Sequence, residues 1–372
     1  MDWKEARALF PAVGKTVYLN TAGGAPLSRG SAAAGLRYYQ QSLDDGDVHW
    51  DDWLEQVEAV RRKLARFLVA RPLNLAFTAN ASTGLNIAAH MLRGTGRVLT
   101  VADEFPSVTL PFLQLGYDVD FVPTDHDGTI GIDDLESADS PDTGVLAISF
   151  VQYRSGFRAD LAALGEYCRE RDMALVVDAT QGFGAFPIDV SASHVDFLSF
   201  SGYKWATCGY SIGALYVGGR FLEPAKFPLV GWRSAREPYA LRNDELDLAE
   251  SAVALEQGHP PFAGIFALGA SLDQIEKIGI GKIAGRILEL TRYLHERLDG
   301  AGIWILSTRD EAHLSGITLV AVDEPAAVVA ALKERGIIVS ARGNGIRVSV
   351  HYYNDHADVD RFVEALAELA GA

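Results

Sequence analysis

The sequence predicts an α/β fold, with a large domain built on a mostly parallel sheet and a small C-terminal α+β domain. As far as about residue 260, short β-branched or apolar runs alternate with longer helical patterns, as expected for βαβ units. Beyond that point, two long helical patterns and a group of short strands change the rhythm. The length of 372 residues suits two domains of roughly 100–200 residues each.

The first part of the chain supplies the alternating elements. Strands are predicted at 98–102, 119–122, 145–150, 174–177, 197–200 and 213–217. Helices are predicted at 52–68, 82–92, 105–115 and 160–171, after a short amphipathic helix over 1–10. No crossover helix separates the last two strands, so we expect that pair to be antiparallel.

The C-terminal part is expected to form a compact unit in which helices cover short strands. Helices are predicted at 262–280, 282–301, 324–336 and 356–370, and strands at 303–306, 316–322, 337–340 and 345–350. We therefore expect residues 14–270 to form the large domain, and residues 1–13 and 271–372 the small one. The first dozen residues are expected to pack on the small domain.

The charge balance and the cysteine count exclude several classes of function. Lys and Arg number 33 against 49 Asp and Glu, a net charge of −16, and such a surface repels nucleic acids and anionic membranes. The only cysteines, Cys168 and Cys208, form neither a disulfide framework nor a zinc-ligand pattern, so no metal site is expected. Neither a secretory signal nor a membrane span is recognisable, and we expect a cytoplasmic protein.

Two strand ends carry the residues that point to chemistry. The strand at 174–177 runs into Asp178 and, three residues on, Gln181, while the strand at 197–200 runs into Ser201 and then Lys204. Because ligands bind at the carboxyl ends of strands in open α/β sheets, Asp178 and Lys204 are expected to face one crevice. A structural ion pair between the two is the alternative interpretation.

The neighbouring residues match the needs of pyridoxal phosphate. This cofactor requires a lysine for a Schiff base and a carboxylate for its pyridine nitrogen. The segment 77–84, between a strand and a helix, offers Ser82 and backbone N–H groups to an anion at a helix N-terminus. Phe105, after another strand, offers an aromatic face.

These motifs resemble the class V aminotransferase family, the branch of fold-type I pyridoxal-phosphate enzymes that contains cysteine desulfurases and isopenicillin-N-epimerase-like proteins. The most specific segments are VVDATQGFGAFPIDV (176–190) and DFLSFSGYKW (196–205), and the resemblance extends over 18–354. It implies the cofactor pyridoxal 5′-phosphate, a small-molecule amino-acid substrate and a homodimer with sites built from both chains.

The resemblance also implies roles for individual residues. Lys204 forms the Schiff base and carries the α-proton, and Asp178 pairs with the pyridine nitrogen. Gln181 hydrogen-bonds either the phenolic oxygen of the cofactor or the region of the Schiff base, and Phe105 stacks on the ring where many relatives have a histidine. The phosphate contacts fall to Ala81 (by its backbone), Ser82, Ser201 and, in place of a family histidine, Tyr203.

Other implied contacts concern the substrate and the partner chain. Arg347 matches the arginine that grips the substrate carboxylate, and Arg342 is a second candidate. His259 stands where relatives use a threonine to reach the partner's phosphate. Either Gln152 or Tyr153 occupies the position of a family asparagine near the ring.

The reaction type is left open by the sequence. The segment 339–347 holds no cysteine, whereas desulfurases of the family carry their nucleophile shortly before the arginine strand. An aminotransferase or a C–S/β-lyase without such a cysteine is therefore expected. The alternatives are an amino-acid epimerase of the isopenicillin-N-epimerase type and, outside catalysis, a cofactor-binding but silent relative that acts as a partner or regulator.

Overall fold

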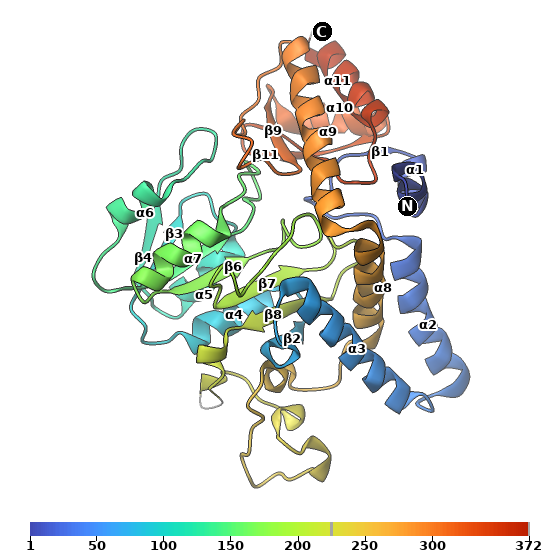
Figure 1. Cartoon of the computed structure of the whole chain (residues 1–372). Helices are drawn as coiled ribbons and strands as arrows, with labels where there is room; N and C mark the ends of the chain where they lie inside the picture. Colours follow the sequence, from blue (N-terminus) through green and yellow to red (C-terminus); the bar gives the residue numbers. More distant parts are fainter. Residues whose placement is uncertain (224–225, 371–372) are drawn as a thin grey trace.

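The computed structural model describes residues 1–223 and 226–370 and shows a seven-stranded sheet next to a smaller, separate sheet (Figure 1). The large sheet has the order β2-β8-β7-β6-β5-β3-β4. Its strands are β2 (Leu75–Thr78), β3 (Arg97–Val101), β4 (Val119–Val122), β5 (Thr143–Ser149), β6 (Ala174–Asp178), β7 (Phe197–Ser201) and β8 (Gly213–Val217). Strands β7, β6, β5, β3 and β4 pair in parallel, whereas β8 is antiparallel to both β7 and β2. The expected antiparallel pair is confirmed.

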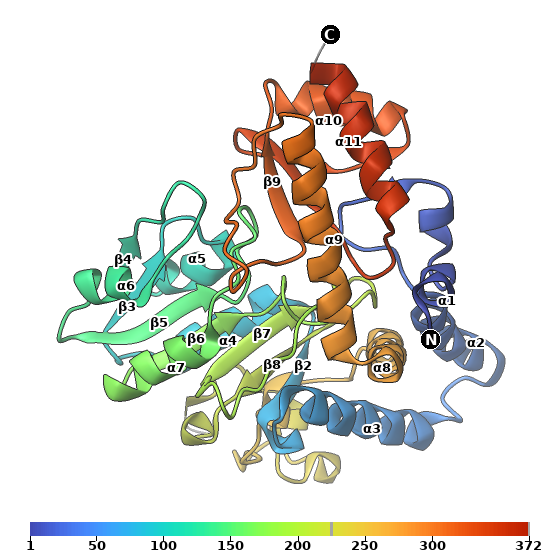
Figure 2. The same cartoon turned by 45° about the horizontal axis from the view of Figure 1, so that its top comes forward.

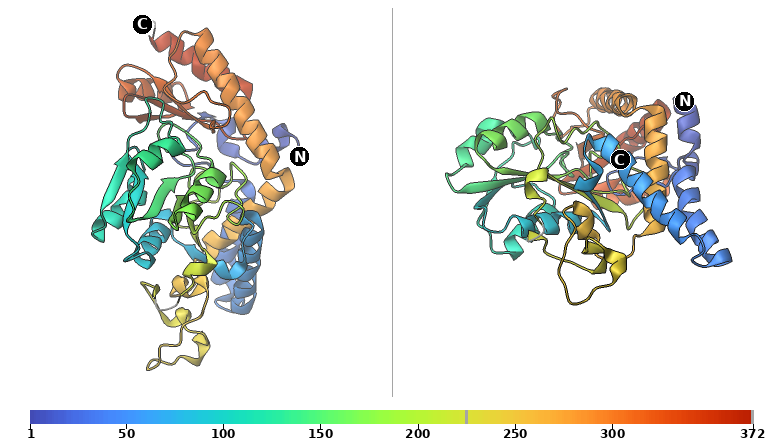
Figure 3. Two further views of the ribbon diagram at one scale, coloured as in Figure 1. Left: turned by 60° about the vertical axis from the view of Figure 1, so that its left-hand side comes forward. Right: turned by 60° about the horizontal axis from the view of Figure 1, so that its bottom comes forward.

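Helices cover both faces of this sheet (Figure 3). One face packs against α4 (Ala81–Met91) and α5 (Pro106–Gln114), and the other against α7 (Leu161–Glu170) together with α3 (Trp50–Leu68) and α8 (Phe262–Ile278). Within β6, Val176 packs on the face covered by α4 and α5, whereas Leu175 and Val177 pack on the face covered by α3, α7 and α8. Strands buried on both faces read as continuous apolar runs, which is why the sequence revealed them. A short helix, α6 (Ile132–Ala138), precedes β5.

One long helix, α2 (Arg29–Asp45), was absent from the sequence prediction. It is capped by Ser28 and packs along α8, but only Ser31 and Ala34 of its residues are buried. At Gly35 a Cβ atom would lie 3.3 Å from the backbone oxygen of Ala263. Small residues, rather than an apolar stripe, therefore bring α2 close to α8, and they leave no hydrophobic periodicity to read.

The C-terminal part forms its own layer of strands and helices (Figure 2). Its antiparallel sheet has the order β11-β12-β9, formed by β9 (Ile317–Ala321), β11 (Ser340–Arg342) and β12 (Gly345–Ser349). The helices are α9 (Ile280–Gly300), α10 (Pro325–Glu334) and α11 (His356–Ala370). The strand expected at 303–306 is wrong, because this segment makes only an isolated bridge between Ile305 and Val320.

The single strand expected at 337–340 is divided between two sheets. Its first half, β10 (Ile337–Ile338), pairs in parallel with β1 (Val17–Tyr18), and its second half begins β11. Further contacts join the chain's beginning to the C-terminal layer: in α1 (Trp3–Ala8), Arg7 donates to Asp358 at 2.6 Å. The division at residue 270 falls within α8 and stays a prediction. Over the described ranges, no helix is both long and apolar enough to cross a bilayer.

Candidate active site

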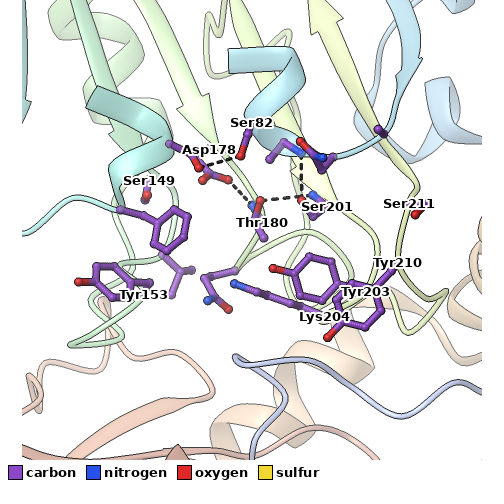
Figure 4. Close-up of a pocket in the computed structure, with 17 residues that line it drawn as sticks. Ser82, Ser149, Tyr153, Asp178, Thr180, Ser201, Tyr203, Lys204, Tyr210 and Ser211 are labelled. Atoms are coloured by element: carbon purple, nitrogen blue, oxygen red, sulfur yellow. Dashed lines mark hydrogen bonds between the residues drawn. The ribbon is translucent and has the colours of Figure 1, made fainter. Parts of the chain in front are cut away.

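The carboxyl ends of β5, β6 and β7 open into a cavity of about 430 Å³ (Figure 4). The N-termini of α4 and α5 close it on one side, as expected for a ligand site in an open parallel sheet. Eight of the sequence-predicted site residues line it together: Ala81, Ser82, Phe105, Asp178, Gln181, Ser201, Tyr203 and Lys204.

Asp178 and Lys204 are both buried in this cavity, with 5% and 8% of their surfaces exposed. Burial raises the pKa of Asp178, against the hydrogen bond from the Thr180 N–H (2.8 Å) and the charge of Lys204. Burial also lowers the pKa of Lys204 to about 8; Arg347 and Arg342 add to this, and Asp178 opposes it. The pair thus offers a buried carboxylate and an amine that releases its proton near neutral pH.

The N-terminus of α4 forms one end of the cavity. The Ala81 N–H donates to the Ser201 hydroxyl at 2.9 Å, and the hydroxyls of Ser82 and Ser107 lie 2.7 Å apart. The helix approaches β7 closely at Gly84, where a Cβ atom would lie 2.2 Å from Ser199 Oγ. Hydroxyls and helix N–H groups of this kind suit an anion such as a phosphate. Ser107 is not predicted from the sequence, because no local pattern indicates that the N-termini of α4 and α5 converge.

Aromatic side chains form two other walls. The Lys204 Nζ atom lies 5.8 Å from the ring centroid of Phe105 and 5.5 Å from that of Tyr203. Phe105 meets Tyr153 edge to face with centroids 5.3 Å apart, and Tyr203 stacks on Tyr210 at 4.4 Å. The cavity therefore has flat apolar surfaces next to its amine, as a ring-shaped ligand requires.

The amide of Gln181 is held in one orientation. Its oxygen accepts from the indole N–H of buried Trp205 at 2.7 Å, so the nitrogen must be the atom that donates to the Ala22 carbonyl at 3.1 Å. The second N–H of this amide group is left for a ligand. Trp205 was not recognised from the sequence as an orienting residue.

Glu104 is a second buried carboxylate beside the cavity, and the sequence prediction missed it. It accepts hydrogen bonds at 2.6 Å from the Ser149 N–H, the Ser149 hydroxyl and the Gln152 amide. Burial raises its pKa to about 7; these bonds oppose the rise, and the charge of Asp178 adds to it. Of the two residues left open above, Tyr153 lines the cavity, whereas Gln152 turns to Glu104.

Arg347 and Arg342 lie just outside the cavity lining, on the β11–β12 hairpin. Arg347 is 1% exposed and donates from Nη1 to the backbone oxygen of Tyr153 at 2.8 Å. Its Nε and Nη2 atoms are buried without a hydrogen-bond partner in the described part of the chain. Burial and the charge of Arg342 lower the pKa of Arg347 to about 9, which identifies it as a cation that needs an anion.

His259 and the two cysteines lie elsewhere in the single chain. His259 is exposed and meets Trp50 and Trp232, each with ring centroids 5.2 Å apart. Cys168 and Cys208 are buried, and burial raises the pKa of each thiol to about 12. Residues 1–223 and 226–370 contain no group of three side chains arranged to hold a metal ion.

Known proteins resemble the chain over almost its whole length. The family model Aminotransferase class-V matches residues 17–362. A probable cysteine desulfurase of Pyrococcus abyssi is 29% identical over 85% of this chain and 83% of its own, and the isopenicillin N epimerase of Streptomyces clavuligerus is 28% identical over 100% and 99%. The apo cysteine desulfurase of Thermococcus onnurineus superposes with a TM-score of 0.90 at 25% identity, covering 99% of this chain and 98% of its own.

The seven-stranded sheet and the cavity at its carboxyl edge define a fold-type I enzyme. The chain belongs to the class V aminotransferase family. It is a pyridoxal-phosphate-dependent enzyme, a transferase or a lyase.

The residues present fit this cofactor. A buried carboxylate with only Oδ1 hydrogen-bonded within the described chain suits a cationic ring nitrogen, and the hydroxyls at the N-terminus of α4 suit a phosphate. The remaining Gln181 N–H and the Phe105 face suit a ring oxygen and a ring surface. A cavity of about 430 Å³ is in the usual range for such a ligand.

Proposed function

We propose that the enzyme acts on an amino acid or amino-acid derivative as an aminotransferase or a C–S/β-lyase, with Lys204 as the residue that binds the cofactor as a Schiff base. One observation carries the proposal: the Lys204 amine, with its pKa lowered to about 8, shares a cavity with Asp178 and the Phe105 ring. An amine in this state is a nucleophile and a base at neutral pH.

The cofactor would be held at three points. Asp178 would pair with its ring nitrogen, Gln181 with its ring oxygen, and the N-terminus of α4 with its phosphate. There the Ala81 N–H is already hydrogen-bonded to the Ser201 hydroxyl, and the Ser82 hydroxyl to that of Ser107. When bound, pyridoxal phosphate supplies an electron sink for the bond that breaks at the substrate α-carbon.

The chain's own residues would then orient the substrate and move its proton. Arg347 would bind the α-carboxylate with its unpartnered Nε and Nη2 atoms, which lie on one edge of the guanidinium. Lys204 Nζ would take the α-proton and return a proton to the product. Transamination and β-elimination both need this single base, and Phe105 cannot act as a second one.

Neither cysteine is a candidate nucleophile in this proposal. Cys208 is buried with its sulfur directed to the Gly202 carbonyl at 3.2 Å, and Cys168 lies in α7. Thiols whose pKa is raised to about 12 remain protonated at neutral pH and react slowly. These observations support chemistry without a desulfurase-type cysteine.

An amino-acid epimerase is the second candidate. The full-length match to the isopenicillin N epimerase of Streptomyces clavuligerus favours it. An epimerase must return the proton to the opposite face of the α-carbon. Besides Lys204 and Asp178, the ionisable side chains among the described lining residues are those of Tyr153, Tyr203 and Tyr210, so this reaction would depend on a tyrosine hydroxyl.

We also propose a homodimer in which His259 contributes to the partner's site. Large apolar side chains lie exposed in the segment 226–258, which projects from the body (Figures 1 and 3): Leu229, Val230, Trp232, Tyr239, Leu241 and Leu246. Trp232 also touches His259. A group of exposed large apolar side chains on one projecting segment supports an interface between chains.

The test is a spectral titration of the protein purified with pyridoxal phosphate. The visible absorbance band of the Lys204-bound cofactor should be absent in Lys204→Ala and present in Lys282→Ala, which removes an exposed lysine. Amino acids are then added one by one. Keto acid would indicate transamination, pyruvate with ammonia β-elimination, and the opposite enantiomer epimerisation. A protein whose band no amino acid disturbs would contradict the proposed function.

A further inference from the structure

The β11–β12 hairpin carries its basic side chains on one face. Ser340 pairs directly with Arg347, and Arg342 pairs with Gly345. Side chains two residues apart in a strand point the same way, so Ser340, Arg342 and Arg347 share a face, with the two arginines as diagonal neighbours. The opposite face carries Ile346, which is buried in the C-terminal core. The arginine face is therefore turned away from that core, toward Tyr153 and Lys204.

A third guanidinium group, that of Arg154, lies beside the turn of this hairpin. A Cβ atom on Gly343, in the turn of the hairpin, would lie only 3.3 Å from Arg154 Nε, so Arg154 lies directly over the turn. Arg154 Nη2 donates to the Asn344 side chain at 3.3 Å. Gly343 has φ +55°, a conformation that glycine adopts at little cost, and its missing side chain makes room for the arginine.

Several donors on this face have no acceptor. Within the part of the chain that the structure describes, Arg347 Nε, Arg347 Nη2, Arg154 Nε and the Ser340 hydroxyl are buried without a hydrogen-bond partner. The one hydrogen bond from the Arg342 guanidinium goes to its neighbour, the Ala341 carbonyl, at 2.7 Å. Buried polar groups are rarely left unpaired in native proteins, so this face is built to receive acceptors.

The charges on this face are also unbalanced. Of the three guanidinium groups, only Arg154 has a carboxylate partner among the described residues: Asp103, at 3.2 Å. The charge of Arg342 helps to lower the pKa of Arg347, and both arginines help to lower the pKa of Lys204. A single α-carboxylate on Arg347 would neutralise one of these two charges and leave the other without a partner.

We propose that the β11–β12 hairpin binds two anionic groups of one substrate: the α-carboxylate on Arg347, and a side-chain anion on Arg342, aided by Arg154 and Ser340. The substrate class is then an amino acid with a second acidic group, such as a carboxylate. This inference rests on the proposed function only in assigning the α-carboxylate to Arg347; the pair of anion sites follows from the hairpin itself.

The substrate preference follows from the cost of an unpaired charge. A neutral side chain in the same space would leave the half-buried Arg342 without an anion. The amide isostere would present an N–H₂ group to a guanidinium. An acidic substrate gains charge-assisted hydrogen bonds there. We expect the dianionic substrate to bind at least about tenfold more tightly than its amide, a ratio that corresponds to one such interaction.

The first experiment compares acidic amino acids with their amides on the holoenzyme. L-Aspartate, L-glutamate and L-2-aminoadipate are titrated against L-asparagine, L-glutamine and L-alanine, and the cofactor absorbance gives each Kd. At least one acid should exceed its amide tenfold in the wild type. Arg342→Gln should remove this preference, so that no acid binds more tightly than its own amide. Arg335→Gln, an exposed arginine in an ion pair with Glu368, should retain it.

The second experiment needs no reaction. Calorimetry should show that the holoenzyme binds glutarate, which has no amino group. Glutaramate should bind the same protein tenfold more weakly than glutarate does. The Arg154→Gln and Arg342→Gln proteins should each bind glutarate tenfold more weakly than the wild type does. Equal affinity for glutarate and glutaramate, or an Arg342→Gln protein that still prefers acids to their amides as the wild type does, would overturn the two-anion site. If no amino acid disturbed the cofactor while glutarate still bound selectively, the proposed function would fail and the two-anion site would stand.

Discussion

The hydroxyl of Ser149 donates to the buried carboxylate of Glu104 at 2.6 Å, and the backbone N–H of Ser149 donates to its other oxygen at the same distance. Ser149 also pairs with Asp178 across β5 and β6. These bonds thus tie a second carboxylate to β5, the strand next to the one that carries Asp178. Burial, with a contribution from Asp178, raises the pKa of Glu104 to about 7.

A raised carboxyl pKa makes stability fall as the pH rises. Between about pH 4.5 and 7 the folded protein holds a proton on Glu104 that the unfolded chain has lost, so the free energy of unfolding decreases across this window. Glu104→Gln should lack this loss, which is on the order of 3 kcal/mol for a shift of this size. Melting temperatures of both proteins at pH 5, 6 and 8 test this.

The control is Glu296→Gln, which changes an exposed glutamate of α9. It should follow the wild type at every pH. Buried histidines such as His351, whose pKa burial lowers to about 3, are present in all three proteins and cancel in the comparison. A parallel pH dependence of wild type and Glu104→Gln would show that Glu104 ionises at an ordinary pH.

The state of Lys204 should govern how the apoenzyme takes up its cofactor. Only the neutral amine attacks an aldehyde, and burial lowers the pKa of Lys204 to about 8. The rate at which the visible band appears should fall about tenfold per pH unit below that value and level off above it. Stopped-flow absorbance between pH 6 and 10 gives the midpoint.

Arg342 provides the matched variant for this measurement. Its charge contributes to the lowered pKa of Lys204, so Arg342→Gln should move the midpoint to higher pH. The exposed Arg335→Gln should leave it in place. A midpoint near 10 in the wild type would mean that the amine is not desolvated in the apoenzyme.

Much of the large domain could be predicted from the sequence because its strands are buried on both faces. The six strands and four helices expected there are confirmed within two residues at each end. The helix α2 was missed because Ala34 and Gly35 pack it without an apolar stripe. The sequence predicts one strand over 337–340, because a run of residues does not reveal which sheet each half joins.

The site residues could be predicted where they lie close together in the sequence, just after a strand. Asp178, Gln181, Ser201 and Lys204 lie at two strand ends, and the structure brings them into one cavity. Glu104 and other partners were not predictable, because their contacts join distant segments. Glu104 meets Gln152, 48 positions away, and Arg154 meets Asn344, 190 positions away. No local pattern marks such pairs.

The close approach of α4 to the sheet predicts opposite outcomes for two glycine substitutions. In Gly84→Ala the new Cβ atom would lie 2.2 Å from Ser199 Oγ, so the helix must shift at a cost of about 1–3 kcal/mol. Its N-terminus, with Ala81 and Ser82, would move with it. Gly285→Ala in α9 meets no atom within 4 Å and should gain about 0.5–1 kcal/mol.

Both variants are measured by chemical denaturation and by cofactor affinity. Gly84→Ala should lose stability and release pyridoxal phosphate more readily. Gly285→Ala should gain stability and bind the cofactor as the wild type does. A Gly84→Ala protein with unchanged cofactor affinity would argue against the N-terminus of α4 as the phosphate site.

The proposed homodimer makes a simple prediction of mass. Light scattering at micromolar concentration should give twice the 40.2 kDa of the chain. A charge at Leu241, which is 72% exposed on the projecting segment, should shift Leu241→Asp toward the monomer, because burying an unpaired charge is costly. Trp304→Asp, at an equally exposed apolar position in the C-terminal part, should remain a dimer. A wild-type monomer would contradict a shared site.

The hydrogen bond from Trp205 to Gln181 should control how firmly the cofactor ring is held. Trp205→Phe keeps an aromatic ring in the core but removes the N–H that fixes the amide. The Gln181 oxygen is then buried without a donor, which costs about 1–3 kcal/mol, and the amide is free to turn its nitrogen away from the ring. Cofactor affinity should fall, and the visible band should shift as the contact to the ring oxygen weakens.

Trp304→Phe, which changes an indole 77% exposed to solvent, should alter neither property. Equal affinity and an unshifted band in Trp205→Phe would mean that the Ala22 carbonyl alone orients Gln181, since that bond would be the only anchor left to the amide.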